Sequence, residues 1–369
     1  MNQFDLTHYV PILRWKQAEK NALAQLYEHD LRCLTPLVEL VPENFIHKDA
    51  NGRITKLTID EVISKIGGQL FQYWGERPFF IDLWLLSSDN LTQGPNHFLA
   101  MLGQYASILN LSLIPVTGIA RDRTYQSAVC ATLSIHNKGA CLRLSLDDIK
   151  RPTLTKDINT LLSLLKLPPE MVDLIIDFKI IDRSAPTFNN ICKLIPSLDR
   201  WRNFIVASGA FPEDLSGLQK NDIHKIERTD WVSWRDQTIA TPSNTRMPIY
   251  SDYTIQHAMY LKRKGRARYS ASIRYTAEDY WIIMRGQDVF KEDGPRFEQW
   301  PAQAILLCDL PEYCEESFSE GDKYIREMSL QHKQTGNMVT WLRAGFNHHI
   351  TFVVRQLASL RGASTGAVS

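Results

Sequence analysis

The sequence predicts an α/β fold, a (β/α)8 TIM-like barrel with a hairpin and helix extension near its C-terminal end. Short apolar, β-branched runs alternate with longer segments of helical spacing, and eight such runs occur. Polar residues interrupt most runs in the middle or toward the C-terminal end. Strands that alternate with helices pair in parallel through crossovers, and eight such units indicate closure into a barrel. A doubly wound open sheet is the alternative.

The eight expected strands are Tyr9–Trp15, Thr35–Val41, Pro78–Leu85, Leu111–Gly118, Ala140–Leu146, Val172–Ile180, Asn203–Ala210 and Met247–Tyr253. The expected helices between them are Lys16–Leu31, Thr58–Trp74, Phe98–Leu109, Tyr125–Ile135, Thr155–Leu167 and Phe188–Leu198. Apolar residues at helical spacing, such as Ala18, Ala22 and Leu26, support the first helix. Thr58, followed three residues later by Glu61, indicates a capped start for the second.

The rest of the chain is expected to extend the barrel. We assign residues 1–254 to the barrel, 255–338 to a basic segment and β-hairpin, 339–361 to a helix that packs back on the barrel, and 362–369 to a flexible tail. The hairpin is expected at Ser270–Tyr275 and Tyr280–Arg285. The helix at Val339–Leu360 can serve as the eighth barrel helix, which makes the residues before it an insertion. The segment Glu213–Arg246 is long, irregular and rich in tryptophan and charge.

Composition excludes several classes of protein. The 369 residues carry a formal net charge of +1, so no strong global attraction to nucleic acid or an anionic membrane is expected. The first residues do not form a secretory signal, and no apolar run is long enough to span a membrane. The six cysteines form no C-x-x-C pair, so a zinc site or disulfide framework is not expected. Reduced thiols fit a cytoplasmic protein.

Four carboxylates interrupt the apolar strands: Glu39, Asp82, Asp177 and Asp252. An ionised carboxylate against the helix layer is unfavourable by several kcal/mol, so we expect these side chains to point into the barrel. Residues two apart on a strand share a face, which places Lys179 beside Asp177. In such barrels the C-terminal rim is where chemistry is performed.

These charges suggest a binding or catalytic site. The four carboxylates are candidates for acid–base catalysis or for holding a divalent metal ion, whose identity stays unknown. The cations that would bind a phosphate or carboxylate are Arg14, Lys16, Arg143, Lys179 and Arg274. The alternative interpretation is a structural network, because acids and bases nearly balance in number.

Three further features are weaker signals. The basic segment Lys262–Arg268 could contact phosphates of nucleic acid, although runs of charge are usually solvated. Ser208 precedes a glycine but lacks the G-x-S-x-G surroundings of a nucleophile. His348 and His349 are adjacent on the last expected helix, so they face different sides, and satisfied buried or surface histidines are expected. The sequence has no dinucleotide fingerprint, phosphate-binding glycine loop or H-E-x-x-H motif.

Several segments carry a resemblance to a known family. They are YVPILRWKQAEKNAL at residues 9–23, PLVELVP at 36–42, SDY at 251–253, IRYT at 273–276 with the later W and RG at 281 and 285–286, and HHI at 348–350. They resemble the phage-type "beta protein" family, named from a protein of a T-even bacteriophage and found in bacteria and phages, often on mobile elements. The resemblance implies a role in phage–host conflict. It implies no catalytic residue and no cofactor.

Two functions are therefore expected as alternatives. The first is a hydrolase at the barrel mouth, with or without a metal ion, that acts on a phosphate-bearing substrate such as a nucleotide or a nucleic-acid end in a phage-defence or mobile-element setting. The second is a non-catalytic subunit of a defence system that recognises a partner protein through residues 213–246 and the basic extension. The sequence leaves open whether the protein is an enzyme.

Overall fold

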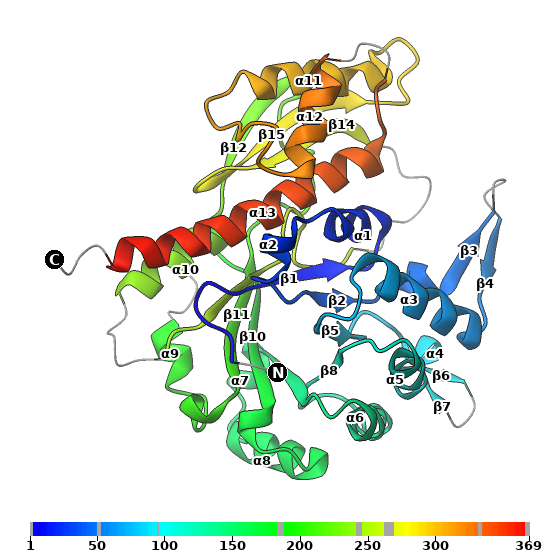
Figure 1. Cartoon of the computed structure of the whole chain (residues 1–369), viewed down its shortest axis with the longest axis vertical. Helices are drawn as coiled ribbons and strands as arrows, with labels where there is room; N and C mark the ends of the chain where they lie inside the picture. The colour runs from blue at the N-terminus through cyan, green and yellow to red at the C-terminus, as the bar shows by residue number, and fades with distance from the viewer. Residues whose placement is uncertain are drawn as a thin grey trace.

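The computed structural model describes residues 3–49, 53–93, 96–182, 188–240, 246–261, 269–330 and 334–365. Eight parallel strands in this part of the chain close into a barrel (Figure 1). They are β1 (Tyr9–Arg14), β2 (Leu37–Glu39), β5 (Phe79–Asp82), β8 (Leu113–Thr117), β9 (Ala140–Ser145), β10 (Val172–Ile180), β11 (Asn203–Gly209) and β13 (Ile249–Asp252). Each of them lies within an expected strand.

Successive barrel strands are neighbours around the barrel, and the last strand pairs with the first. β13 pairs in parallel with β1 from Tyr9 opposite Tyr250 to Pro11 opposite Asp252. This pairing leaves no open edge, so it confirms the predicted (β/α)8 barrel and excludes the doubly wound open sheet. The carboxyl ends of all eight strands therefore meet at one mouth.

Helices surround the barrel between the strands. The helices up to β13 are α1 (Gln17–Ala24), α2 (Glu28–Leu31), α3 (Ile59–Tyr73), α4 (Ser88–Leu91), α5 (Phe98–Ile108), α6 (Arg123–His136), α7 (Leu146–Ile149), α8 (Leu154–Leu165), α9 (Phe188–Cys192) and α10 (Thr229–Ala240). Short 3-10 turns occur at Pro42–Phe45, Pro169–Met171, Leu198–Arg200 and Arg296–Glu298. Two small hairpins project from the barrel, β3 (Ile46–Lys48) with β4 (Ile54–Lys56) and β6 (Thr92–Gln93) with β7 (Asn96–His97).

Several expected elements differ from the structure. The helix expected over Lys16–Leu31 is divided into α1 and α2. The helix expected over Phe188–Leu198 ends at Cys192. Pro196 disfavours a helix that continues as far as Leu198. The irregular segment between β11 and β13 contains α10, whose buried face is carried by Trp231 and Trp234. Its helical periodicity is weak because its other residues are mostly polar, and tertiary packing stabilises it.

The barrel strands alternate between an inner and an outer face. Val10, Ile12, Phe80 and Ile175 belong to the cluster that fills the barrel interior. Their neighbours along the strands, such as Leu13, belong to the larger cluster between the strands and the helices. This period of two fixes which strand residues reach the mouth.

An accessory layer lies beyond the barrel, at the top of Figure 1. It is an antiparallel sheet of β12 (Asp222–Glu227), β15 (Tyr280–Asp288) and β14 (Ser270–Thr276), covered by α11 (Gln299–Cys308) and α12 (Glu320–Leu330). β14 and β15 are the expected hairpin. β12 reaches this sheet from the segment between β11 and β13. Trp300, Trp341 and Ile325 lie in its own hydrophobic core.

The long helix α13 (Met338–Thr365) crosses from the accessory layer to the barrel (Figure 1). Trp341 and Ala344 pack in the accessory core, whereas Ile350 and Val353 pack in the barrel core. α13 thus takes the place of the eighth barrel helix, as expected, and the accessory elements after β13 are an insertion. Residues 366–369 of the expected tail and the basic segment Lys262–Arg268 lie outside the described residues. Within the described chain, we find no helix with both the length and the hydrophobicity to span a membrane.

Candidate functional site

Three of the four predicted carboxylates converge on one arginine at the barrel mouth. Nη1 of Arg143, on β9, donates to Glu39 Oε1 at 2.8 Å and to Asp82 Oδ2 at 2.6 Å. Nε and Nη2 of Arg143 donate to Asp177 Oδ2 at 3.0 and 2.8 Å. These side chains occupy inward-facing positions of β2, β5, β9 and β10, as the strand alternation predicts. The predicted inward ring therefore exists, with Arg143 at its centre.

Two basic side chains, on β10 and in the loop after β8, complete the cluster. Lys179 Nζ lies 3.0 Å from Asp177 Oδ2. Arg121 Nη2 lies 2.5 Å from Asp82 Oδ1. The cluster of three carboxylates and three cations is close to neutral, so each charge is compensated locally, as buried ions require.

The neighbouring cations control the ionisation of the carboxylates. Burial alone raises the pKa of Asp82, but the charges of Arg121 and Arg143, with a hydrogen bond from Arg143, bring that pKa below its ordinary value. Burial also raises the pKa of Asp177, and the charges of Lys179 and Arg143 outweigh it, so this pKa is lowered as well. Both side chains are ionised at neutral pH and are poor proton donors.

The aspartates also shape the ends of their strands. Oδ1 of Asp82, Asp177 and Asp252 accepts the backbone N–H two residues further on, at 2.9 Å in each case. Aspartate side chains favour such turns because they hydrogen-bond to nearby backbone. At two of these turns a residue adopts positive φ, Lys179 at 58° and Thr254 at 58°. Asp82 and Asp252 are thus the last residues of β5 and β13, whereas β10 continues past Asp177 through an irregular register to Ile180.

Asp252 does not belong to the mouth, and the expectation that it faces the lumen is wrong. Its carboxylate accepts hydrogen bonds from the hydroxyls of Tyr9 at 2.5 Å and Tyr250 at 3.0 Å, and Oδ2 lies 3.0 Å from His349 Nε2 on α13. These donors replace the solvent, so a carboxylate is tolerated between the sheet and the helices. His349 reaches this outer face and not the mouth, and both His348 and His349 are buried with hydrogen-bond partners.

The other predicted residues lie apart from the Arg143 cluster. Arg14 is buried and bonds to the segment after β13, with Nη2 2.8 Å from the His257 carbonyl. Lys16 is exposed, and its Nζ lies over the ring of Tyr260. Arg274 belongs to β14 in the accessory sheet. Its Nη1 donates to the Ile255 carbonyl at 2.7 Å. Ser208 is buried and does not line the mouth pocket.

A small pocket of about 50 Å³ opens beside the cluster. It is lined by Asp82, Trp84, Thr117, Gly118, Ala120, Arg121, Arg143, Ser145, Asp148, Asp177 and Lys179. Trp84 is 53% exposed. The Arg121 guanidinium lies 4.8 Å from the Trp84 ring centre and 4.5 Å from that of Tyr125. The pocket thus combines cations with an exposed aromatic face.

Reasoning from the sequence did not assign Trp84, Arg121 or Tyr253 to this site. Trp84 lies two residues after Asp82, in the loop after β5. Arg121 lies in the loop after β8, where exposed charge is the usual interpretation. The Tyr253 hydroxyl lies 2.7 Å from both Asp177 Oδ2 and Arg143 Nη2, and 2.8 Å from Lys179 Nζ. The sequence did contain a signal for Tyr253. Neighbouring residues on a strand face opposite sides, so either Asp252 or Tyr253 points into the barrel, but not both.

The described side chains do not form a ready metal site. Among them, no group of three histidine, cysteine or acidic residues has the arrangement to hold a metal ion. At the mouth, oxygens of Glu39, Asp82 and Asp177 already accept hydrogen bonds from Arg143. A divalent ion prefers such oxygens, so it would have to displace the guanidinium.

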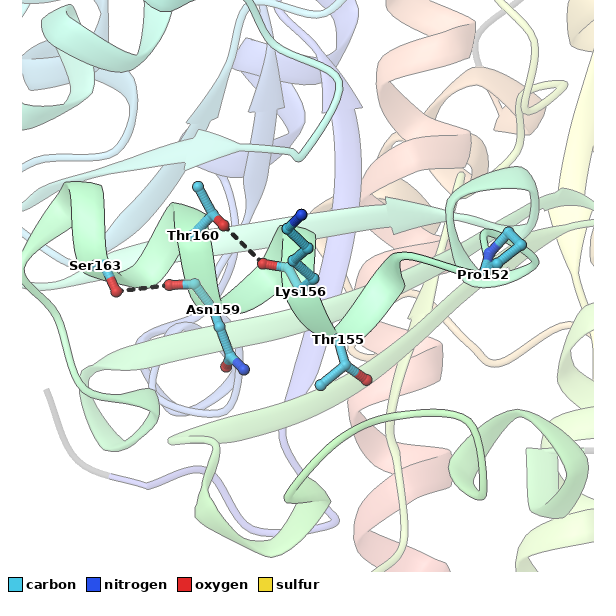
Figure 2. A pocket seen from close by; sticks show the side chains of 6 residues that line it. All are labelled: Pro152, Thr155, Lys156, Asn159, Thr160 and Ser163. Atoms are coloured by element: carbon cyan, nitrogen blue, oxygen red, sulfur yellow. Dashed lines mark hydrogen bonds between the residues drawn. The ribbon is translucent and has the colours of Figure 1, made fainter.

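A larger hollow of about 720 Å³ lies along α8, outside the barrel (Figure 2). Two of its hydroxyls bond to their own helix: Thr160 Oγ1 donates to the Lys156 carbonyl and Ser163 Oγ to the Asn159 carbonyl, both at 2.8 Å. The hollow is open and lined by polar side chains of one helix and by Pro152. It offers no convergent set of charges, so the mouth is the stronger candidate.

The fold and the mouth define a (β/α)8-barrel protein with an ion-paired, partly aromatic opening. The sequence model of the family described as Beta protein matches residues 9–355, and the chain belongs to that family. This confirms the resemblance found in the sequence. No match was found among curated proteins. One similar solved structure, described as "PhdJ bound to substrate intermediate", aligns over 96% of this chain and 97% of that chain, with 10% identity and a TM-score of 0.30. A likeness this weak carries no argument about function.

Proposed function

We propose that this protein is a non-catalytic recognition protein whose barrel mouth binds a small phosphate-bearing ligand of the nucleotide class. One observation carries the proposal. The carboxylates and Arg143 are almost fully buried, whereas Lys179, Arg121 and Trp84 line the pocket with partly exposed side chains, although Lys179 and Arg121 are each paired with one aspartate on their inner side. These three groups are the ones that an incoming ligand can contact first.

Each group suits one part of such a ligand. The ammonium of Lys179, whose side chain is 27% exposed, and the Arg121 guanidinium can donate to phosphate oxygens. The exposed face of Trp84 can stack against a base. Drug-sized ligands usually occupy pockets of about 300–1,000 Å³, so a pocket of about 50 Å³ admits a phosphate group and leaves the rest of the ligand across Trp84.

The ionisation of the mouth supports recognition over catalysis. A general acid needs a pKa near the working pH, and the pKa values of Asp82 and Asp177 are lowered. The second candidate remains a metal-dependent hydrolase. Glu39, Asp82 and Asp177 favour it because they stand at the C-terminal mouth, where such barrels perform chemistry. This function requires Arg143 to leave the carboxylates when the metal binds.

The cellular setting belongs to the same proposal. The six free cysteines support a reducing compartment such as the cytoplasm. Membership of the Beta protein family supports a role in phage defence or on mobile elements, where the protein would work with a partner protein. Contact with nucleic acid through Lys262–Arg268 is a further part of the proposal, on residues outside the described chain.

Calorimetric titration with ADP tests the binding function. We expect Lys179→Ala to weaken ADP binding about 10- to 100-fold, the effect of a lost hydrogen bond between charged groups. Trp84→Ala should also weaken it, because base stacking is lost. The matched control is Lys225→Ala, because Lys225 is an exposed, ion-paired lysine on the accessory sheet.

Two results would contradict the recognition proposal. The first is a wild-type protein that does not bind ADP at millimolar concentration, or a Lys179→Ala variant that binds as wild type does. The second is release of phosphate from ADP in the presence of Mg²⁺ or Mn²⁺ that Asp82→Asn abolishes. That second result would favour the hydrolase.

A further inference from the structure

The segment Thr254–Tyr260, here called the strap, covers one half of the barrel mouth. It directly follows β13. Ala258 packs among the side chains that fill the barrel interior, together with Val10 and Ile12 of β1. The pocket, in contrast, is lined from β5, β8, β9, β10 and the loops after them. The mouth is therefore divided into an open half and a half closed by the strap.

The strap accepts hydrogen bonds from the guanidinium of Arg14. Nη1 of Arg14 donates to Gln256 Oε1 at 3.0 Å, and Nη2 donates to the carbonyls of His257 at 2.8 Å and Ala258 at 3.1 Å. The guanidinium is buried, and its Nε has no hydrogen-bond partner among the described residues. A guanidinium fork matches the oxygens of a phosphate or carboxylate. The strap carbonyls thus stand where the oxygens of an anion would bind.

Polar contacts also hold the strap at its far end. The Tyr260 hydroxyl donates to Glu43 Oε1 at 2.6 Å. The Tyr260 ring lies beneath the Lys16 ammonium, 5.0 Å from the ring centre. Glu43 belongs to the turn after β2, so this hydrogen bond clasps the strap across the mouth. The strap is also held by Gln256 Nε2, which donates to Glu19 Oε1 at 2.7 Å, and by His257 Nδ1, 3.0 Å from the Phe211 carbonyl. The clasp is the partly exposed one of these contacts, so its loss loosens the far end of the strap first.

The first residue of the strap, Thr254, has a strained backbone, and the residue before it contacts the open half of the mouth. Thr254 has a φ of 58°, a left-handed conformation that is rare and unfavourable for a β-branched residue. The preceding residue, Tyr253, places its hydroxyl against Lys179 and Arg143. A movement at Thr254 is therefore coupled to the cations that line the pocket.

We propose that the strap is a ligand-responsive lid, whose carbonyls block Arg14 when closed and whose opening makes Arg14 a second anion-binding group of the mouth. The inference rests on the proposed function because the same mouth binds the ligand. One phosphate of ADP would contact Lys179, and the other would replace the strap carbonyls on Arg14. Only molecules with an open lid bind ADP in this way. The apparent Kd is therefore the intrinsic Kd divided by the fraction of molecules in the open state.

Releasing the clasp with Tyr260→Phe tests this inference. We expect hydrogen exchange of the strap amides, such as that of Gln256, to rise about threefold or more. The affinity for ADP should rise about 3- to 10-fold, since less binding energy goes into opening. The matched control is Tyr280→Phe, which removes a tyrosine–glutamate bond of the same length, 2.6 Å to Glu312, in the accessory sheet. It should change neither quantity at the mouth.

The outcomes separate the two proposals. If Tyr260→Phe and wild type bind ADP equally, the lid is refuted while the proposed function stands. Unchanged exchange of the strap also refutes the lid, because the clasp then holds nothing. If neither protein binds ADP even though exchange rises, the proposed function fails, and the ligand-responsive lid fails with it. Tighter binding with faster exchange, seen only for Tyr260→Phe, supports both.

Discussion

Replacing Arg143 with methionine removes a cation that contacts three carboxylates at the mouth. The Arg143 side chain is 8% exposed, and Glu39, Asp82 and Asp177 are 1%, 0% and 3% exposed. Breaking a buried ion pair by removing one partner destabilises a protein by about 3–5 kcal/mol. With an unfolding entropy of about 2.1 cal/mol/K per residue, we expect the melting temperature to fall by about 4–6 °C.

The loss should depend on pH. With Arg143 gone, the pKa values of Asp82 and Asp177 rise toward those of buried carboxyls, so these groups bind protons in the folded protein before they do in the unfolded chain. Protonation stabilises the folded state of the variant, and its deficit should be smaller at pH 5 than at pH 8. Circular dichroism melts at the two pH values measure this.

The matched control is Arg200→Met, which breaks an exposed pair with Glu170 of the same 2.8 Å separation. Exposed pairs contribute little to stability, so its melting temperature should stay within about 1 °C of wild type. If Arg143→Met melts as Arg200→Met does, at both pH values, then the mouth network does not stabilise the barrel.

Two further predictions concern the interior. Burial and the charge of Asp252 raise the pKa of Asp230 to about 7, so the folded state keeps a proton that the unfolded chain releases near pH 4. Stability should therefore decline as the pH rises from about 4 to 7, by up to about 4 kcal/mol. Urea denaturation of Asp230→Asn should lack this decline, and an identical pH profile would refute the assignment. Gly321→Ala places a Cβ 2.3 Å from the Ala344 carbonyl and should destabilise by about 1–3 kcal/mol. Gly68→Ala, with open space around it, should not lower the melting temperature.

Most of the fold could be predicted because its signals are local. Each barrel strand is a short apolar run, and each run must be buried on both faces in a parallel barrel. Alternation along β2, β5 and β10 correctly placed Glu39, Asp82 and Asp177 at the mouth. α10 was not predicted because its buried face depends on two tryptophans, Trp231 and Trp234, whose packing sites come from distant parts of the chain.

Asp252 shows where reasoning from the sequence fails. A carboxylate in an apolar strand has to be compensated, and the sequence does not show by what. Its partners are Tyr9, 243 residues away, and His349, 97 residues away. Only the packing of α13 against β1 and β13 brings these donors together, so the outward orientation of Asp252 is a tertiary result.

By itself, the sequence determined the barrel and the presence of charged groups at the strand ends, because the hydrophobic period of each strand and helix is a local property. Short sequence segments determined the family. The tertiary structure decided the state of those charges. It placed Arg143 between three carboxylates, turned Asp252 away from the mouth and laid the strap over Arg14. These arrangements depend on contacts between residues tens to hundreds of positions apart, whose electrostatic compensation exists only after the barrel has closed.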